Sequence, residues 1–347
     1  MAKELKSSLK GLKRSRRKGI VLSSESMIKT RFLNDGDVMP LVIEPGMENV
    51  NLSRWLEGHR QEVEGYLHKH GALLFRGFDV NSIDGFEAVA RAMSPDLLDY
   101  VERAAPRGEM GNQIFNSTEY PANQWIPLHH EMSYSHNWPT KLFFYCHTEP
   151  GERGYTPITN ERETIKKIPD RIKDPFLQKG VMYVRNYGEG VDMPWQTVFQ
   201  TDNKSEVEAQ LDQSKTEYQW FGERLRTRAR RQVVAEHPVT GDRVWFNHAH
   251  MFHISNMPDA VRKALLEEFS EEQLPRNSFY GDGSRIEDES AEFIRNLYRD
   301  TAITFPWKKG DVLLLDNFLT AHGRTPYSGP RQICVAMAEL YTNPDFR

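Results

Sequence analysis

The chain has 347 residues, 38% of them hydrophobic, which is enough to fill the core of one large domain or two small ones. Its 45 basic and 49 acidic residues leave a formal net charge of −4, too little to draw the protein onto nucleic acid or an anionic membrane. No apolar run approaches the 18 residues of a membrane span. We therefore expect a small-molecule partner, with no nucleic acid and no membrane bound.

The N-terminal segment 3–18 is rich in lysine and arginine, and no apolar stretch of seven or more residues follows it. This is not the pattern of a secretory signal. Residues 1–19 are predicted to form a flexible, solvated tail, with docking onto an acidic partner protein as the alternative. The only cysteines, Cys146 and Cys334, lie inside apolar runs, which favours buried reduced thiols and a cytoplasmic location.

The first predicted element is a helix over residues 52–70, because apolar residues recur there near helical spacing and Gly71 follows as a stop. The next stretch, ALLFRGF, is predicted to be a buried strand. Shorter runs then follow, separated by turn residues: LFFYC, GVMYV, RVWF, AITF, VLLL and QICVAMAEL. Short strands spaced in this way are typical of a β-sandwich or jelly roll.

Two stretches are too long to be hairpin loops, a polar one at 202–231 and a second one at 258–299. Both are predicted to be helical insertions over the mouth of the barrel. We therefore predict an α+β fold in which residues 20–347 form a single domain. Residues 20–95 are expected to be a helical buttress, and an insertion around 200–300 is expected to form a helical lid.

The segment IPLHHEMSYSH contains His129 and Glu131 two positions apart. On an extended strand, residues i and i+2 point to the same face, so these two side chains can approach one cation while His130 points away. Alone, such a tripeptide is more often a solvated or hydrogen-bonded pair than a metal site. His322 is the candidate third ligand, because it follows the apolar run VLLL in a segment of polar residues.

Two histidines and one carboxylate leave three positions of an octahedron open, the arrangement of non-haem iron(II) oxygenases. The same set with a water molecule describes a zinc hydrolase, so the three residues leave both open. An oxygenase of this kind also needs a bidentate donor for the distal carboxylate of a 2-oxo acid. Arg331, at the start of the run QICVAMAEL, is a candidate, and Thr156 is the candidate hydroxyl donor beside it.

Together, these residues resemble the taurine dioxygenase family of iron(II)- and 2-oxoglutarate-dependent oxygenases. The chain is most similar to the clavaminate-synthase-like branch, which uses H-x-E in place of H-x-D. The segments that carry the likeness are HGALLFRGF at 70–78, STEYP at 117–121, PLHHEMSY at 127–134, PGERGYTPITN at 150–160, HPVTGDRVWFNHAHMFH at 237–253 and DNFLTAHGRTPYSGPRQICVAM at 316–337. The resemblance implies a double-stranded β-helix, or jelly roll.

The resemblance also implies roles for single residues. It makes three residues the iron ligands: His129, Glu131 and His322. It makes Arg331 the partner of the distal carboxylate of 2-oxoglutarate, and Thr156 matches the threonine that helps to hold this cosubstrate. Arg324 matches a family position too, for which cosubstrate support and a supporting ion pair both stay open.

A further group of histidines comprises His248, His250 and His253. No nearby cysteine or carboxylate completes a tetrahedral metal set with them. Pocket lining is favoured instead, with Asn247 and either His248 or His250 reaching the substrate. The aromatic stretch MPWQTVF at 193–199 is predicted to pack in the core or the lid, with stacking on the substrate as the alternative.

The implied activity is oxidation of an aliphatic C–H bond with Fe(II), 2-oxoglutarate and O2, most simply hydroxylation. Desaturation or cyclisation by the same chemistry stays open. Glu131 argues against halogenation, because halogenating relatives have a small residue at that position. The likeness leans toward amino-acid-modifying enzymes of secondary metabolism, similar to the aspartyl hydroxylases of nonribosomal peptide assembly. The expected substrate is an amino acid or its derivative, free or tethered to an acyl or peptidyl carrier protein.

Overall fold

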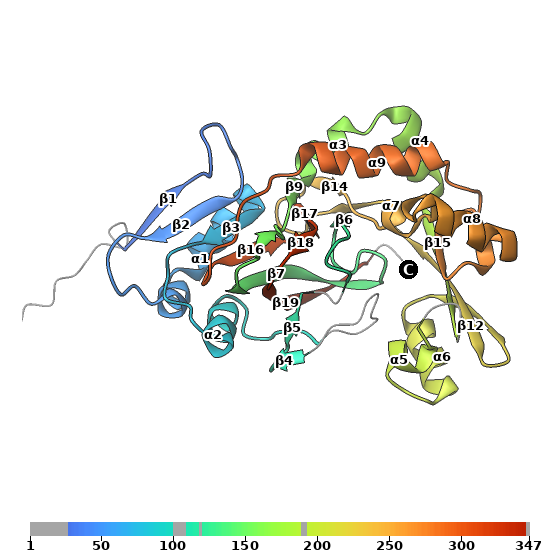
Figure 1. The fold of residues 1–347 in the computed structure, drawn as a ribbon, viewed down its shortest axis with the longest axis horizontal. Helices are drawn as coiled ribbons and strands as arrows, with labels where there is room; N and C mark the ends of the chain where they lie inside the picture. Colours follow the sequence, from blue (N-terminus) through green and yellow to red (C-terminus); the bar gives the residue numbers. More distant parts are fainter. Residues whose placement is uncertain (1–26, 100–108, 118–119, 189–192, 345–347) are drawn as a thin grey trace, which may run out of the picture.

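The computed structural model describes residues 27–99, 109–117, 120–188 and 193–344, which are drawn in colour in Figure 1. The basic segment that is predicted to be a flexible tail lies outside these residues. The described strands form sheets of eight, four and three strands and two sheets of two strands. None of the helices within the four described ranges is long and apolar enough to cross a membrane.

The eight-stranded sheet forms the centre of the molecule (Figure 1). In order across the sheet, its strands are β1 (Ile28–Arg31), β2 (Leu41–Pro45), β3 (Ala72–Phe75), β16 (Val312–Asp316), β7 (Asn137–Thr148), β19 (Gln332–Thr342), β5 (Ile114–Asn116) and β4 (Glu109–Gly111). Four of the predicted apolar runs form its inner strands β3, β16, β7 and β19. The central positions of these runs are apolar without alternation because both faces of the sheet are covered.

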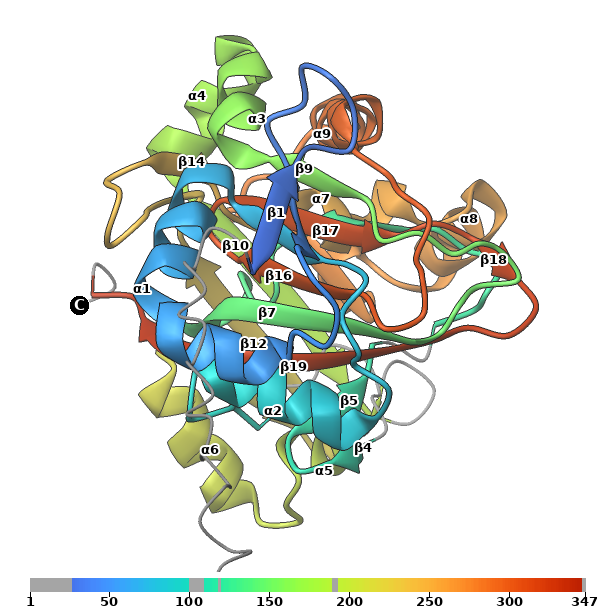
Figure 2. The ribbon, with the colours of Figure 1, turned by 90° about the vertical axis from the view of Figure 1, so that its left-hand side faces the viewer.

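Two helices cover one face of this sheet, α1 (Leu52–His70) and α2 (Ile83–Met93) (Figure 2). α1 begins at Asn51, whose side chain accepts a backbone N–H of the first turn, and ends at Gly71, which has a φ of 73°. The helix predicted over residues 52–70 is therefore confirmed. The prediction for 20–95 is incomplete, however, because this segment also contributes the strands β1, β2 and β3 to the sheet.

A three-stranded sheet covers the other face. Its strands are β6 (Ile126–His129), β17 (Thr320–Arg324) and β9 (Ile158–Asn160), with β17 in the middle. Alternate side chains of β16 serve the two faces: Val312 and Leu314 pack with the helices, whereas Leu313 and Leu315 belong to the core between the sheets. Two sheets packed face to face in this way agree with the predicted jelly roll.

The chain between β9 and β16 contains most of the remaining elements, many of them in the right-hand part of Figure 1. They are α3 (Glu161–Lys167), α4 (Asp170–Lys179), β10 (Val181–Tyr187), α5 (Trp195–Phe199), α6 (Lys204–Gln213), β11 (Glu217–Phe221), β12 (Arg224–Arg231), β13 (Val234–Glu236), β14 (Arg243–Trp245), α7 (Ala249–Phe252), α8 (Asp259–Glu268), β15 (Arg276–Tyr280) and α9 (Asp288–Thr301). Four of these strands form a sheet in the order β11-β12-β10-β15.

The insertion is less helical than predicted. The stretch 202–231 contains the helix α6, but its second half is the hairpin of β11 and β12. β12 has the sequence RLRTRARR, in which the inward face presents Leu225, Thr227, the small Ala229 and the buried Arg231. So little apolar area faces inward that the alternation typical of a strand is hidden. The stretch 258–299 likewise contains the strand β15 between the helices α8 and α9.

One predicted strand is wrong. The run AITF does not form a strand, because within it only Ile303 pairs with another segment, in a single bridge to Ile158 of β9. The cysteines agree with the prediction, since Cys146 and Cys334 are buried free thiols on the adjacent strands β7 and β19. Burial raises the pKa of Cys146 to about 12 and that of Cys334 to about 11, so both thiols stay protonated and unreactive at neutral pH.

Candidate active site

The antiparallel pairing of β6 and β17 brings two predicted metal ligands together. His322 lies directly opposite His129 in this pairing, and the centroids of the two imidazole rings are 4.6 Å apart. The register then shifts, so that Arg324 pairs with Ile126. Between these pairs lies Gly323, where an added Cβ would be 2.6 Å from the carbonyl oxygen of Ile126. Only glycine therefore allows the two strands to approach so closely beside the histidines.

Glu131 reaches the same place from a turn. β6 ends at His129, and Glu131 opens the turn at 131–134, in which Met132 has a φ of 59°. The prediction that both residues lie on one extended strand is therefore wrong for Glu131. The predicted convergence is nevertheless present, because the ligand atoms of Glu131, His129 and His322 all lie within 4.8 Å of one another. Oε2 of Glu131 is 3.8 Å from Nε2 of His322.

Asn317 holds the backbone of Glu131 in position. Its Oδ1 accepts the Glu131 N–H at 2.8 Å, and its Nδ2 donates to the carbonyl oxygens of Glu131 and Pro139 at 3.0 and 2.8 Å. Asn317 lies in the turn between β16 and β17, so the same turn supports Glu131 and leads into the strand that carries His322. His130 points away from this site, as predicted, with its Nδ1 2.6 Å from the Asn317 carbonyl oxygen.

The tautomer of His129 suits metal binding. Its Nδ1 lies 2.8 Å from the carbonyl oxygen of Pro127, which can only accept, so Nδ1 carries the proton and donates. Nε2 is then left with a lone pair for a cation, and a backbone carbonyl behind a ligand histidine is the usual way to fix its orientation. Two imidazole nitrogens and one carboxylate in a buried site fit an iron(II) ion with open coordination positions.

A cavity adjoins the two histidines. His129 and His322 line it together with the three predicted cosubstrate residues, Thr156, Arg324 and Arg331. The cavity therefore joins the predicted metal site to the predicted cosubstrate site. Sequence reasoning missed three further side chains that line it: Ser117, Ile126 and Phe144. Ser117 lies in the segment STEYP and Ile126 begins the segment IPLHHEMSYSH, so a motif could have drawn attention to both, whereas Phe144 lies in the apolar run LFFYC.

Arg331 presents a partly buried cation to this cavity. Its Nε donates to the carbonyl oxygen of Gly154 at 2.9 Å and its Nη1 to Oγ of Ser117 at 3.3 Å. Within the described residues no carboxylate pairs with it. Burial, together with the nearby guanidinium of Arg324, lowers the pKa of Arg331 to about 10. An anion in the cavity would offset the cost of burying this charge.

Thr156 and Arg324 play different parts in the cavity wall. The hydroxyl of Thr156 accepts from Nε1 of Trp307 at 3.2 Å, so its own proton is free to point elsewhere, as a donor to a ligand requires. The Nη atoms of Arg324 donate to three backbone carbonyls of the 120–124 loop, at distances from 2.6 to 3.0 Å. Among the described residues Arg324 forms no ion pair, so the structure favours loop support over the supporting ion pair considered above.

The three predicted substrate-pocket residues are not equally placed. Asn247 binds the Val233 carbonyl and the Ala249 N–H, and His250 binds the Leu128 carbonyl, so both are engaged in holding backbone. Burial lowers the pKa of His250 to about 3, which keeps it neutral. His248 is nearer the site, since its ring centroid is 5.2 Å from that of His129.

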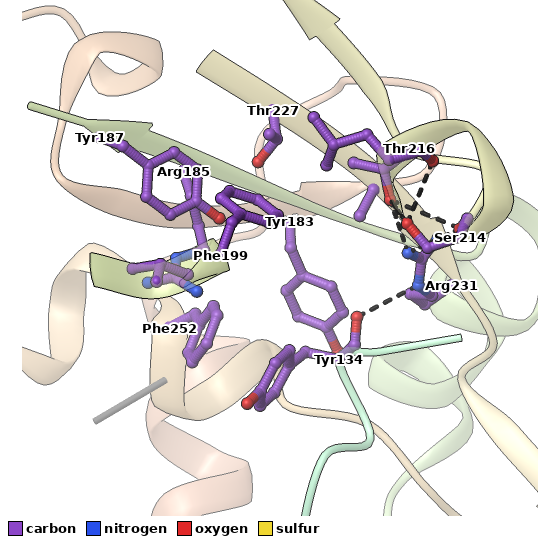
Figure 3. A pocket seen from close by; sticks show the side chains of 13 residues that line it. Tyr134, Tyr183, Arg185, Tyr187, Phe199, Ser214, Thr216, Thr227, Arg231 and Phe252 are labelled. Atoms are coloured by element: carbon purple, nitrogen blue, oxygen red, sulfur yellow. Dashed lines mark hydrogen bonds between the residues drawn. The ribbon is translucent and has the colours of Figure 1, made fainter. Parts of the chain in front are cut away.

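His248 also contacts a residue, Tyr134, that lines a second cavity. Its ring centroid is 5.0 Å from that of Tyr134, and Tyr134 lines a cavity beside β10 and β12 (Figure 3). Burial lowers the pKa of His248 well below its ordinary value, and the surrounding histidines act in the same direction. Asn247 and His250 do not line either of the two cavities described here.

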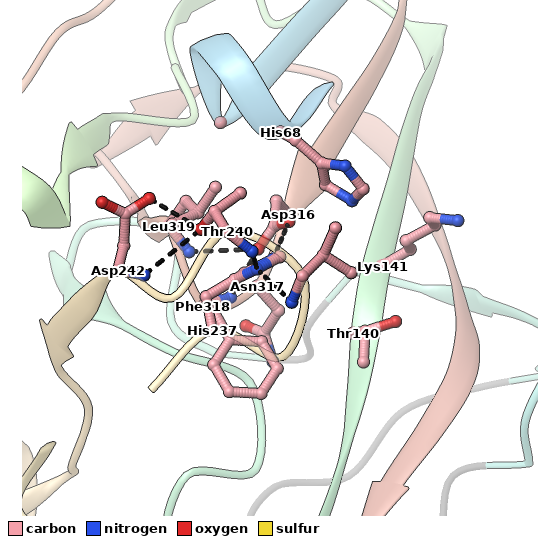
Figure 4. Close-up of polar contacts among 12 residues, drawn as sticks. His68, Thr140, Lys141, His237, Thr240, Asp242, Asp316, Asn317, Phe318 and Leu319 are labelled. Carbon is pink, nitrogen blue, oxygen red and sulfur yellow. Dashed lines mark hydrogen bonds and ion pairs between the residues drawn. The ribbon is translucent and has the colours of Figure 1, made fainter. Parts of the chain in front are cut away.

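His68, His237 and Asp316 form another group in which metal ligand types converge (Figure 4). Nδ1 of His237 accepts the backbone N–H groups of Val239 and Thr240 at 3.1 and 3.0 Å, so this nitrogen carries no proton. Nε2 of His237 lies 2.8 Å from Oδ2 of Asp316 and donates to it. Both ring nitrogens are thus occupied, and the group braces the start of the turn that leads into β17.

A Gly323→Ala variant tests whether the close approach of β6 and β17 forms the metal site. The added methyl group must push the strands apart, so we expect metal affinity to fall about 10- to 100-fold, as for other residues that orient ligands. Calorimetric titration with Fe(II) under anaerobic conditions measures this. The control is Gly65→Ala in α1, which has open space around it and should leave affinity unchanged. Equal affinity in both variants would contradict the argument.

A His237→Ala variant distinguishes bracing from metal binding in the second group. We expect a loss of about 1–3 kcal/mol in the free energy of unfolding, because buried partners lose their hydrogen bonds, with metal content still one ion per chain. Denaturant unfolding and elemental analysis of the metal-loaded protein measure the two effects. His68→Ala is the companion variant, and a fall in stoichiometry there would show that this group binds metal after all.

Comparison with known proteins agrees with this site. Residues 37–337 match the family described as "Taurine catabolism dioxygenase TauD, TfdA family". The dapdiamide synthesis protein DdaC of Enterobacter agglomerans is 37% identical over 278 residues, which cover 80% of this chain and 84% of DdaC. A clavaminate synthase-like protein of Arabidopsis thaliana is 29% identical over 321 residues, 86% of this chain and 93% of that protein.

Among solved structures, PvcB of Pseudomonas aeruginosa has a TM-score of 0.54 at 16% identity, covering 93% of this chain and 97% of PvcB. This similarity confirms the predicted fold. The family match decides between the oxygenase and the zinc hydrolase in favour of the oxygenase. The chain belongs to the TauD, TfdA family and is a dioxygenase that depends on iron(II) and 2-oxoglutarate.

Proposed function

We propose that this dioxygenase hydroxylates an aliphatic C–H bond of an amino acid or an amino-acid-derived molecule in secondary metabolism. Support for the metabolic setting comes from the relative that is 37% identical, which is named as a dapdiamide synthesis protein. The observation that carries the proposal is the cavity that His129 and His322 line together with Arg331. One small space thus offers metal ligands and a cation for the far end of a dicarboxylate.

We assign His129, Glu131 and His322 as the residues that hold the iron, and Arg331 and Thr156 as those that hold 2-oxoglutarate. The bound metal supplies the oxidising chemistry with 2-oxoglutarate and O2. The chain's own contribution is geometric. Arg331 offers a guanidinium fork to the distal carboxylate, and the Thr156 hydroxyl offers a donor beside it.

The surroundings of these residues keep the site dry and the ligands oriented. Phe144 contacts the His322 ring at 5.1 Å between centroids and lines the cavity, so it limits the space for water. Asn317 fixes the backbone of Glu131, and the Pro127 carbonyl fixes the ring of His129. Ligands held in a fixed orientation are what directed C–H oxidation requires, because the reactive group must meet one substrate bond only.

We also propose that the substrate is tethered to an acyl or peptidyl carrier protein. The support is the basic segment 3–18, whose charge complements an acidic carrier, and the resemblance to aspartyl hydroxylases of nonribosomal peptide assembly. The cytoplasmic location remains a prediction, consistent with two buried free thiols.

The function is tested by adding Fe(II) and 2-oxoglutarate to the protein under anaerobic conditions and then offering substrates in air. We expect a visible charge-transfer band that is absent in His322→Ala, because that variant lacks a ligand. We expect succinate to form with a panel of carrier-loaded amino acids and to be matched by hydroxylated product. Turnover of free amino acids alone would contradict the tethered substrate. A desaturated or cyclised product would show that the reaction is desaturation or cyclisation and not hydroxylation. A normal band in His322→Ala would refute the assignment of His322 as a metal ligand.

Arg331→Ala should raise the apparent KM for 2-oxoglutarate far more than that for the primary substrate. Removing one partner of a desolvated bidentate pair typically costs about 2–5 kcal/mol, or about 30-fold to several thousand-fold in affinity. Arg331→Lys keeps the charge but loses the fork, so it should lie between wild type and Ala. Steady-state kinetics with each cosubstrate varied separately measures this. If the KM for 2-oxoglutarate is near normal in Arg331→Ala but raised in Arg324→Ala, then Arg324 and not Arg331 binds the distal carboxylate.

A further inference from the structure

The second cavity lies between two clusters of buried apolar side chains. The inner cluster includes Phe252 of α7 and extends to Leu128 of β6 and Ala321 of β17, the two strands that carry the proposed histidine ligands. The outer cluster belongs to the insertion alone and includes Val198 of α5 and Leu211 of α6. Phe252, Val198 and Leu211 all line the cavity, so apolar surfaces from both clusters face the same space.

The pairing of β10 with β12 explains why there is space. Tyr183 of β10 pairs with Ala229 of β12, and Arg185 pairs with Thr227. Paired residues of neighbouring strands place their side chains on the same face of the sheet. Each long side chain of β10 therefore stands beside a short one of β12, and the short ones leave room for the cavity (Figure 3).

This cavity adjoins the proposed metal site. Tyr134 lines it and follows Glu131 by three residues in the chain. The ring of Tyr134 contacts the ring of His248, which in turn contacts that of His129, with centroid distances of 5.0 and 5.2 Å. The backbone N–H of His248 also donates to the hydroxyl of Tyr183, another residue of the cavity wall, at 2.6 Å. One imidazole ring thus separates the wall from a proposed metal ligand.

Thr227 presents a hydroxyl group to the cavity. The residue is only 4% exposed, and its hydroxyl forms no hydrogen bond with any residue of the described ranges. Buried hydroxyl groups almost always have a hydrogen-bond partner. The hydroxyl groups of Ser214 and Thr216, which line the same cavity, lie 3.0 Å apart and bond to each other. The Thr227 hydroxyl is therefore left for a ligand, to which it can donate and from which it can accept.

The two arginines of the wall are engaged by the protein itself. Arg231 donates to the carbonyl oxygen of Tyr134 at 3.1 Å and to Oγ1 of Thr216 at 2.8 Å. The guanidinium of Arg185 lies over the ring of Tyr187, 4.7 Å from its centroid. A buried carboxylate is costly without a cation to pair with it. The wall therefore suits an uncharged ligand that has an apolar body and a hydrogen-bonding group.

We propose that this cavity binds the side chain of the primary substrate and that Thr227 forms a hydrogen bond with an uncharged polar group of that side chain. The inference rests on the proposed function and specifies its substrate class: an amino-acid derivative whose side chain carries an amide or a hydroxyl group on an apolar body. The bound side chain covers apolar surface of both clusters, which favours binding in proportion to the area removed from water. The reacting carbon then lies on the side of Tyr134 and His248, towards the metal.

The test uses the full-length protein loaded anaerobically with Fe(II) and 2-oxoglutarate, and follows the shift of the visible band on adding free and carrier-loaded amino acids. The probes are matched pairs of a polar and an apolar side chain: asparagine with leucine, glutamine with methionine, and tyrosine with phenylalanine. Aspartate and glutamate are the charged counterparts. We expect at least one polar probe to bind, with its apolar counterpart about fivefold weaker or more. Both acids should bind about tenfold more weakly than this polar probe, or weaker still.

Thr227→Val keeps the shape of the side chain and removes the hydroxyl. We expect it to weaken the polar probe about fivefold or more, because the polar group is then buried without a partner, and to leave the apolar counterpart unchanged. Thr227→Ser restores a hydroxyl and should restore the binding of the polar probe.

Two further variants separate this effect from damage to the fold. Ala229→Leu fills the cavity beside Tyr183 and should weaken the polar probe and its apolar counterpart alike. Arg228→Gln changes the other face of β12, where Arg228 pairs with Glu272 at 2.7 Å, and should bind every probe as the wild type does. The affinity for 2-oxoglutarate should be unchanged in all four variants.

The outcomes also separate this inference from the proposed function. Absence of the band in the wild-type protein would refute the proposed function itself. With a normal band, the inference is overturned if no polar probe binds, or if an acid binds as tightly as the best polar probe. Full affinity of Thr227→Val for the polar probe, or an equal loss for its apolar counterpart, would overturn the role of Thr227. Normal affinity in Ala229→Leu would show that the substrate lies elsewhere.

Discussion

The site depends above all on one strand pairing, that of β6 with β17, which sets His129 opposite His322. The two strands lie in the smaller sheet of the jelly roll, and Gly323 lets their backbones approach where any side chain would collide with the carbonyl of Ile126. Metal ligands on separate strands need only a correct register to converge, because the pleat already points them to one face. The glycine beside His322 is thus part of the proposed metal site, although it offers no ligand atom.

The turn from β16 to β17 holds Glu131, the proposed carboxylate ligand, in position. Asp316 accepts hydrogen bonds from the N–H groups of Phe318 and Leu319 and from His237. Asn317 accepts a hydrogen bond from the backbone N–H of Glu131. Two neighbouring side chains thereby connect the large sheet, the insertion and the ligand turn. Their hydrogen bonds are buried, so each is costly to break. This explains how a carboxylate on a turn can be held as firmly as a histidine on a strand.

Much of this could be predicted from the sequence, and the exceptions have physical reasons. The helix ending at Gly71, the inner strands of the large sheet and the grouping of His129, Glu131 and His322 follow from periodicity and motifs. The hairpin of β11 and β12 was hidden because the inward face of β12 carries a single large apolar side chain, Leu225, with Thr227, Ala229 and the buried Arg231. The strand geometry expected for Glu131 failed because a left-handed residue, Met132, ends the extended backbone. Neither cavity could be predicted, since each depends on which residues of distant strands are paired.

The two cavities lie in two parts of the fold. Thr156 and Arg331 line the same cavity as His129 and His322, so the proposed cosubstrate and iron sites belong to one unit, the jelly roll. The cavity beside β10 and β12 belongs to the sheet of the insertion, and the insertion contacts that unit through His248, whose ring centroid is 5.0 Å from that of Tyr134.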